Sequence, residues 1–168
     1  MIKDGKKKVW DDYQKEIADD KFYYVRSCIR QTIWPGSENI YLRILKDVLG
    51  KDIYESENHT TCTGIGYHSE VVPFETIQTV VARNFSLMKE AGYENYNPSC
   101  VTSFGIYTEI LETWHHFPDE KNKVINFLKQ ATNRDFVEPK NLAHTSDVLF
   151  KFRNEIAAKA KYRLFNKE

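Results

Sequence analysis

The chain lacks the features that mark several large classes of protein. Lys plus Arg and Asp plus Glu number 24 each, so the formal net charge is zero and no basic excess predicts nucleic-acid binding. No apolar run approaches the roughly 18 residues that a membrane span needs. The N-terminal lysines precede no apolar stretch of the kind found in a signal peptide. We therefore expect a cytoplasmic protein with no membrane span and no nucleic-acid partner.

Cysteine is also scarce, and the three present are Cys28, Cys62 and Cys100. In a reducing compartment, an odd number of cysteines argues against a disulfide framework and favours metal ligands or free thiols. A dinucleotide fingerprint is missing too, because Gly64-Ile65-Gly66 has no third glycine at the required interval. With 168 residues, the chain is long enough for one domain with a core of its own.

Aromatic residues, in contrast, make up 14% of the chain and include ten Tyr and ten Phe. A domain of this size can bury only part of them, and Tyr and Trp are enriched at protein–protein interfaces. A permanent protein partner is one interpretation of this composition. A tyrosine-rich surface without a role is the other.

Alternating strand and helix patterns predict an α/β fold in which a small parallel sheet is flanked by helices. Strands are expected over residues 22–27, 52–55 and 93–99. Helices are expected over residues 9–20, 37–49, 74–91, 101–116, 119–131 and 141–165. Loops are expected over residues 29–36 and 59–69. This pattern divides the chain into an N-terminal helical extension (1–21), an α/β domain (22–135) and a C-terminal helix (136–168) that packs on the domain or on a partner.

Each cysteine lies near the end of a segment that is expected to be extended. The carboxyl ends of neighbouring parallel strands gather at one edge of a sheet, so the three thiols are placed to converge on a metal or a substrate. Cys100 should also begin a helix, where unpaired backbone N–H groups and the helix dipole favour the thiolate. Ser103, one turn further along, should direct its hydroxyl to the same side.

At these positions the chain resembles the cysteine-rich CCG domain family, which typifies the B-type subunits of heterodisulfide reductase. The family pattern of Cys, Cys-Cys and Cys-x-x-Cys reads here as Cys28, Thr61-Cys62 and Cys100-x-x-Ser103. The resemblance implies a Rossmann-like half of a CCG-domain protein, corresponding to the N-terminal half of its members. In the family, each motif holds an iron–sulfur cluster that reduces a disulfide or passes electrons within a larger complex. The ligand set is degenerate here, because Thr61 and Ser103 stand where the family has thiols.

The resemblance implies that Cys28, Cys62 and Cys100 hold a cluster, with Thr61, Ser103 and Gly64 beside it. Hydroxyls rarely replace thiolates as cluster ligands, so a 4Fe–4S cluster with one open iron, or a three-iron cluster, is favoured over the five-thiolate form.

The same three thiols could instead form a tetrahedral zinc site if a histidine supplied the fourth ligand. His59 and His68 flank the Cys62 segment and are the candidates, with His144 a weaker one. Binding of no metal at all is the remaining alternative.

Three functions follow from these observations. The first is a redox or electron-transfer subunit of a heterodisulfide-reductase-like complex, with that complex's other subunits as partners. The second is a structural or assembly subunit of such a complex that has lost full cluster binding. The third is a metal-free thiol enzyme with Cys100 as nucleophile. The first two are favoured, the cluster-linked role slightly ahead, and no residue is assigned to catalysis.

Overall fold

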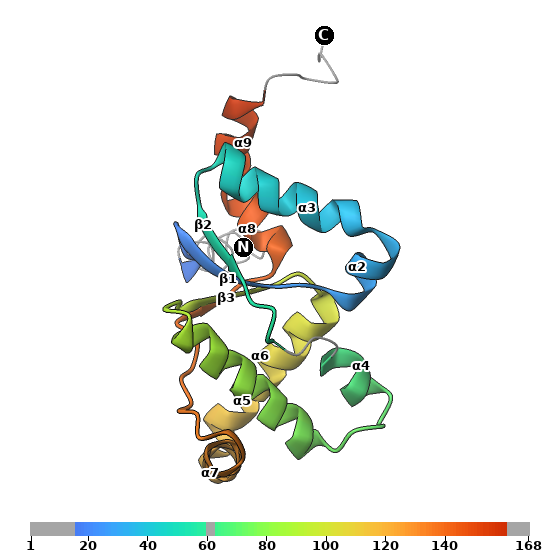
Figure 1. Ribbon diagram of the computed structural model, residues 1–168, viewed down its shortest axis with the longest axis vertical. Coiled ribbons are helices and arrows are strands. Elements are labelled where there is room, and N and C mark those ends of the chain that lie inside the picture. Colours follow the sequence, from blue (N-terminus) through green and yellow to red (C-terminus); the bar gives the residue numbers. More distant parts are fainter. Residues whose placement is uncertain (1–15, 60–62, 161–168) are drawn as a thin grey trace, which may run out of the picture.

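A parallel sheet of four strands forms the centre of the protein, in the order β2-β1-β3-β4. The computed structural model describes residues 16–59 and 63–160 (Figure 1). The strands are β1 (Lys21–Val25), β2 (Asp52–Glu55), β3 (Asn95–Pro98) and β4 (Asn141–Leu142). The predicted α/β class is therefore confirmed, and the helix expected over residues 9–20 lies largely outside the described residues.

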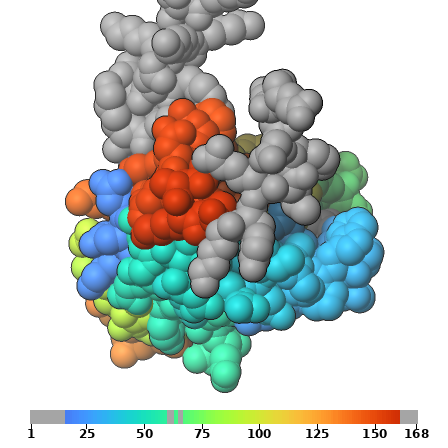
Figure 2. Space-filling view, turned by 90° about the horizontal axis from the view of Figure 1, so that it is seen from above, coloured from blue at the N-terminus to red at the C-terminus, as the bar shows by residue number. Residues whose placement is uncertain are grey.

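Helices cover both faces of the sheet. Their bounds are α2 (Cys28–Ile33), α3 (Pro35–Arg43), the π-helical turn η1 (Ile44–Val48), α4 (Thr63–His68), α5 (Phe74–Glu90), α6 (Val101–His116), α7 (Pro118–Thr132), α8 (Thr145–Lys151) and α9 (Arg153–Lys159). Figure 1 shows α3, α8 and α9 on one side of the sheet and α4 to α7 on the other. Figure 2 shows the layer of α3, α8 and α9 from outside, and there η1 and the C-terminal helices lie side by side. Lys159 of α9 donates a hydrogen bond to the carbonyl of Val48 in η1 at 3.0 Å.

Strand β1 joins the two hydrophobic cores because its side chains alternate between the faces of the sheet. Phe22 and Tyr24 pack with α3 and α8, whereas Tyr23 and Val25 pack with α5 and α6. All four are at most 3% exposed, as befits a central strand covered on both faces.

Most of the tyrosines in the described part of the chain lie in these cores. Tyr23, Tyr24, Tyr41, Tyr96 and Tyr107 are each at most 3% exposed. The aromatic content therefore reflects the core in large part, and a tyrosine-rich docking face is not needed to explain it.

Residues 29–36, expected as a loop, instead form α2 and the start of α3. Ser27 caps α2 by accepting a hydrogen bond from the Arg30 amide at 3.3 Å. Pro35 is the first residue of α3, a position that suits its fixed φ and its missing N–H. Ser37, the first residue of the helix expected over residues 37–49, lies inside α3.

Residues 59–69, also expected as a loop, contain α4, which packs on α6. A Cβ on Gly64 would lie 2.5 Å from Cγ2 of Thr102, so the approach of the two helices requires a glycine there. Gly64 therefore lies where the backbone of α4 comes close to α6.

The single helix expected over residues 141–165 is replaced by β4, α8 and α9. His144 caps α8, since its Nδ1 accepts a hydrogen bond from the Ser146 amide at 3.2 Å. Val148 of α8 and Phe152, the residue between α8 and α9, are both buried. Strand β4 has two residues, too few for an alternating pattern to appear in the sequence.

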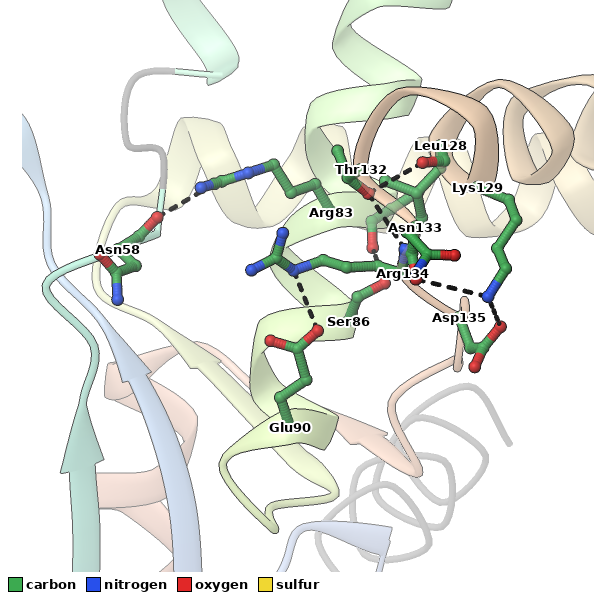
Figure 3. A network of polar contacts seen from close by, with 11 residues as sticks. Asn58, Arg83, Ser86, Glu90, Leu128, Lys129, Thr132, Asn133, Arg134 and Asp135 are labelled. Carbon is green, nitrogen blue, oxygen red and sulfur yellow. Dashed lines mark hydrogen bonds and ion pairs between the residues drawn. The ribbon is translucent and has the colours of Figure 1, made fainter.

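A polar network joins α5 to the segment after α7 and to the segment after β2 (Figure 3). Arg134 pairs with Glu90 of α5 at 2.9 Å, just beyond the left-handed residue Asn133 that ends α7. Arg83, also on α5, donates to the carbonyl of Asn58 at 3.0 Å. The network therefore anchors the chain shortly before the segment that contains Cys62.

Candidate functional site

The sheet changes winding direction between β1 and β3. From β1 the chain passes through α2 and α3 to β2 on one side, whereas β3 pairs with β1 on the other side. Ligands of open α/β sheets bind outside the carboxyl ends of the strands at such a switch point. A pocket of 460 Å³, hereafter the switch-point pocket, opens at this place. Its lining residues are Ser27, Ile29, Arg30, Trp34, Ser37, Ser99, Cys100, Val101, Thr102 and His144.

Cys100 lines this pocket and is the N-cap of the 16-residue helix α6. Burial raises the pKa of the Cys100 thiol, but the backbone and side-chain groups of Ser103 and Thr102 stabilise the thiolate and bring the pKa below its ordinary value. The sulfur makes no capping hydrogen bond of strict geometry, so we attribute the lowering to the close approach of these donors. Ser103 thus accompanies Cys100 as expected.

Cys28 lies just after the neighbouring strand β1 as the first residue of α2, one residue beyond the N-cap Ser27. Its thiol is free and half-buried. Strands β1 and β3 pair directly, and the Ser99 amide extends the ladder by donating to the carbonyl of Val25 at 2.9 Å. The fold therefore brings Cys28 and Cys100 to adjacent strand ends, although Cys28 is not among the residues that line the pocket.

The third cysteine and its neighbour Thr61 lie outside the described residues. Gly64, two residues further along, packs against Thr102, which is itself two residues from Cys100. Within residues 16–59 and 63–160, no group of three or more His, Cys, Asp or Glu side chains is arranged to hold a metal ion.

Glu38 ties the two cysteine-bearing strand ends together, a role that the sequence did not reveal. Its side chain is 1% exposed, and its Oε1 accepts hydrogen bonds from the Ser27 amide at 2.7 Å and from the Ser99 hydroxyl at 2.6 Å. Ser27 precedes Cys28 and Ser99 precedes Cys100. One buried carboxylate therefore sets the spacing of the two segments.

His144 supports the same segment from β4 but is poorly placed to bind a metal. Its Nδ1 accepts from the Ser146 amide, so the proton lies on Nε2, which donates to the carbonyl of Ser99 at 3.2 Å. Burial lowers the pKa of His144 and favours the neutral ring. With both nitrogens engaged, His144 positions the backbone next to Cys100.

His59 follows β2 at the same edge of the sheet. Neither ring nitrogen makes a hydrogen bond of normal geometry within the described part of the chain. Burial lowers the pKa of His59, an effect partly offset by the nearby Ser56 carbonyl, and the neutral ring is the form that binds metals. His68, in contrast, is exposed at the end of α4.

Comparison with known proteins gives one informative relative. No protein-family model matches the sequence. The sequence is similar to a heterodisulfide reductase subunit. That protein is the B-type subunit of the ferredoxin:CoB-CoM heterodisulfide reductase of Methanosarcina acetivorans, 28% identical over 153 residues that cover 84% of this chain and 48% of the relative. The chain therefore spans about half of that protein's length.

The fold is also found in a crystal structure of a hypothetical protein from Helicobacter pylori. The two superpose with a TM-score of 0.61 and 12% identity, over 83% of this chain and 30% of the other. At this identity the likeness concerns the fold alone. In addition, no helix among the described residues combines the length and the apolar character that crossing a bilayer requires.

Proposed function

We propose that this chain is a subunit of a heterodisulfide-reductase-like redox complex and holds a metallocluster at the carboxyl edge of its sheet. The similarity over 84% of the chain to a heterodisulfide reductase subunit carries the proposal. The arrangement of the described thiols supports it, because Cys28 and Cys100 lie at adjacent strand ends beside a pocket.

The proposed ligands are Cys28, Cys62 and Cys100, with His59 as the candidate fourth ligand. The donors present suit a metal centre: the environment of Cys100 favours the thiolate, Cys28 is free, and the ring of His59 is without a hydrogen-bond partner of normal geometry among the described residues. Thiolates are the usual protein ligands of iron–sulfur clusters, and such a cluster would supply one-electron transfer when bound. We propose a 4Fe–4S cluster, with zinc as the alternative metal.

The other residues of the site would position these ligands and adjust their charge. Glu38 holds Ser27 and Ser99, the residues just before Cys28 and Cys100, and His144 holds the carbonyl of Ser99. Ser103 stabilises the charged form of Cys100. In the family pattern Thr61, Ser103 and Gly64 lie beside the cluster, and we propose the same neighbourhood here.

A second candidate is an assembly subunit that keeps the fold without the cluster. The hydroxyl residues Thr61 and Ser103, which stand where the family has thiols, favour it. Under this alternative the chain binds its partner subunits regardless of its metal content.

Metal analysis separates the two candidates. Protein purified without oxygen should contain iron and acid-labile sulfide and show visible charge-transfer absorption. Cys28→Ser, Cys62→Ser and Cys100→Ser should each remove most of the iron, whereas His116→Ala, at the far end of α6, should not. If the wild-type protein contains neither iron, sulfide nor zinc, the cluster proposal is wrong and the assembly role stands.

A further inference from the structure

The mouth of the switch-point pocket is surrounded by exposed apolar side chains. Ile29 and Ile33 are 44% and 59% exposed and lie one turn apart on α2. Trp34 is 63% exposed and Val101 is 70% exposed. Ile29, Trp34 and Val101 also line the pocket itself. We call Ile29, Ile33, Trp34 and Val101 the rim; in Figure 1 their elements, α2 and the first turn of α6, lie at the same end of the sheet.

Backbone hydrogen bonds on both sides of Trp34 fix the position from which its side chain is exposed. Trp34 joins α2 to α3, and its amide donates to the carbonyl of Arg30 at 2.9 Å. Its own carbonyl accepts from the Ser37 amide at 3.0 Å and from the Ser37 hydroxyl at 2.8 Å. A large indole is therefore held in solvent by fixed backbone groups, the condition under which an anchor residue loses little entropy on binding.

Arg30 adds a charge to this apolar surface. It lines the pocket, as Trp34 does, and forms no ion pair with any carboxylate in the described part of the chain. Trp and Arg are the side chains most enriched among residues that dominate binding energy, and such residues are surrounded by a ring that excludes water. A partner that covers the rim must supply a carboxylate, because a buried guanidinium without a counter-charge is strongly unfavourable.

We propose that the rim docks another subunit of the redox complex, one that presents a carboxylate to Arg30 within an apolar patch. This inference rests on the proposed function and adds the surface through which the complex forms. Docking there closes the pocket over Cys100 and removes that thiol from water. A second groove, of 370 Å³ between α5 and α7, is lined by Glu75, Glu120 and Lys123 as well as Phe127, and neither Cys28 nor Cys100 lines it.

The test compares the full chain alone with the full chain purified anaerobically in its assembly, using hydroxyl-radical footprinting. Ile33 and Trp34 should become several-fold less reactive in the assembly. Phe127, which is 59% exposed on α7 and therefore matches Ile33, should not change. Arg30→Glu should remove the co-purifying subunits, whereas Lys123→Glu at the other groove should retain them. When binding to the purified partner subunit is measured, Trp34→Ser should raise the Kd by about tenfold or more.

Three other outcomes would each contradict a different part of the proposal. If other subunits co-purify but Phe127 is protected and the rim is not, the docking surface is wrong and the proposed function stands. If native mass spectrometry shows a second copy of this chain over the rim, the occupant is wrong. If no other subunit co-purifies and the rim stays reactive, the proposed function fails and the docking surface fails with it.

Discussion

At the scale of single residues, the site depends on small groups that adjust one thiol and fix its backbone. The pKa of Cys100 reflects a balance in which burial opposes the thiolate and the neighbouring Ser103 and Thr102 groups favour it. The helix start alone does not decide this balance, because it also depends on side chains that the fold orients toward the sulfur.

Removal of the Ser103 hydroxyl should therefore raise the pKa of Cys100. We expect Ser103→Ala to slow alkylation of Cys100 by iodoacetamide several-fold at neutral pH and to shift its rate–pH profile upward. Thr113→Ala is the matched control, since the Thr113 hydroxyl bonds only to the carbonyl of Glu109 in the same helix, at 2.8 Å. An unchanged profile for Ser103→Ala would mean that the backbone amides alone stabilise the thiolate.

Loss of the Glu38 carboxylate should destabilise the protein more than loss of a surface acid. Glu38→Ala leaves the buried Ser27 amide and Ser99 hydroxyl without an acceptor, which should lower the free energy of unfolding by about 2–4 kcal/mol. Glu38→Gln keeps one acceptor oxygen and should cost about 1 kcal/mol. Urea denaturation measures both, with the exposed Glu57→Ala as control. Equal effects from all three variants would refute the role given to Glu38.

At the scale of elements, the site is formed where helices begin. α2 and α6 each start directly after a strand that contributes to the sheet centre, and α4 lies against the first turns of α6. The distance between α4 and α6 depends on the absence of a side chain at Gly64. The close contact of Gly64 with Thr102 therefore sets how near α4 lies to the first turn of α6, two residues after Cys100.

Gly64→Ala should disturb this contact in a way that a second substitution relieves. The new Cβ would meet Cγ2 of Thr102 at 2.5 Å, and the strain should lower the free energy of unfolding by roughly 1–3 kcal/mol. Thr102→Ser removes that methyl group, so the double variant should recover most of the loss. Gly105→Ala, where nothing lies within 4 Å of the new Cβ, should be neutral or stabilising. Additive losses in the double variant would show that the contact is not the cause.

At the scale of the whole molecule, stability should depend on pH through a histidine at the carboxyl edge of the sheet. His144 is tied to Ser99 through Nε2, and burial lowers its pKa from the ordinary value of 6.5. A histidine with a lowered pKa in the folded state binds fewer protons than in the unfolded state as the pH falls below 6.5. Its contribution to stability is therefore complete above that pH and is lost on acidification.

Acid should thus weaken the protein in part through His144. We expect the free energy of unfolding to decrease as the pH falls below 6.5, with a shallower decrease in His144→Gln. His116→Gln, on an exposed side chain, should follow the wild-type curve. Denaturant unfolding across this pH range provides the measurement. A slope in His144→Gln equal to that of the wild type would assign the acid sensitivity to other groups, His59 first among them.

Local patterns in the sequence determined much of the fold. The long apolar period of α5, the helix start after Cys100 and the α/β order follow from spacing and turn residues, and the structure confirms them. The short elements α2, α4 and β4 were missed because they extend over only two to six residues, within which neither helical nor alternating periodicity can develop.

Tertiary structure alone decided which distant groups meet. The sequence placed cysteines near strand ends, but strand pairing made β1 and β3 neighbours and so put Cys28 and Cys100 at adjacent strand ends. Glu38 is 61 residues from Ser99. Nothing in the sequence around Glu38 indicates that its carboxylate would link Ser27 to Ser99. The rim arises in the same way, from α2 and α6. The physical reason is that periodicity reports which face of an element is buried, whereas contacts between elements depend on how the whole sheet is ordered.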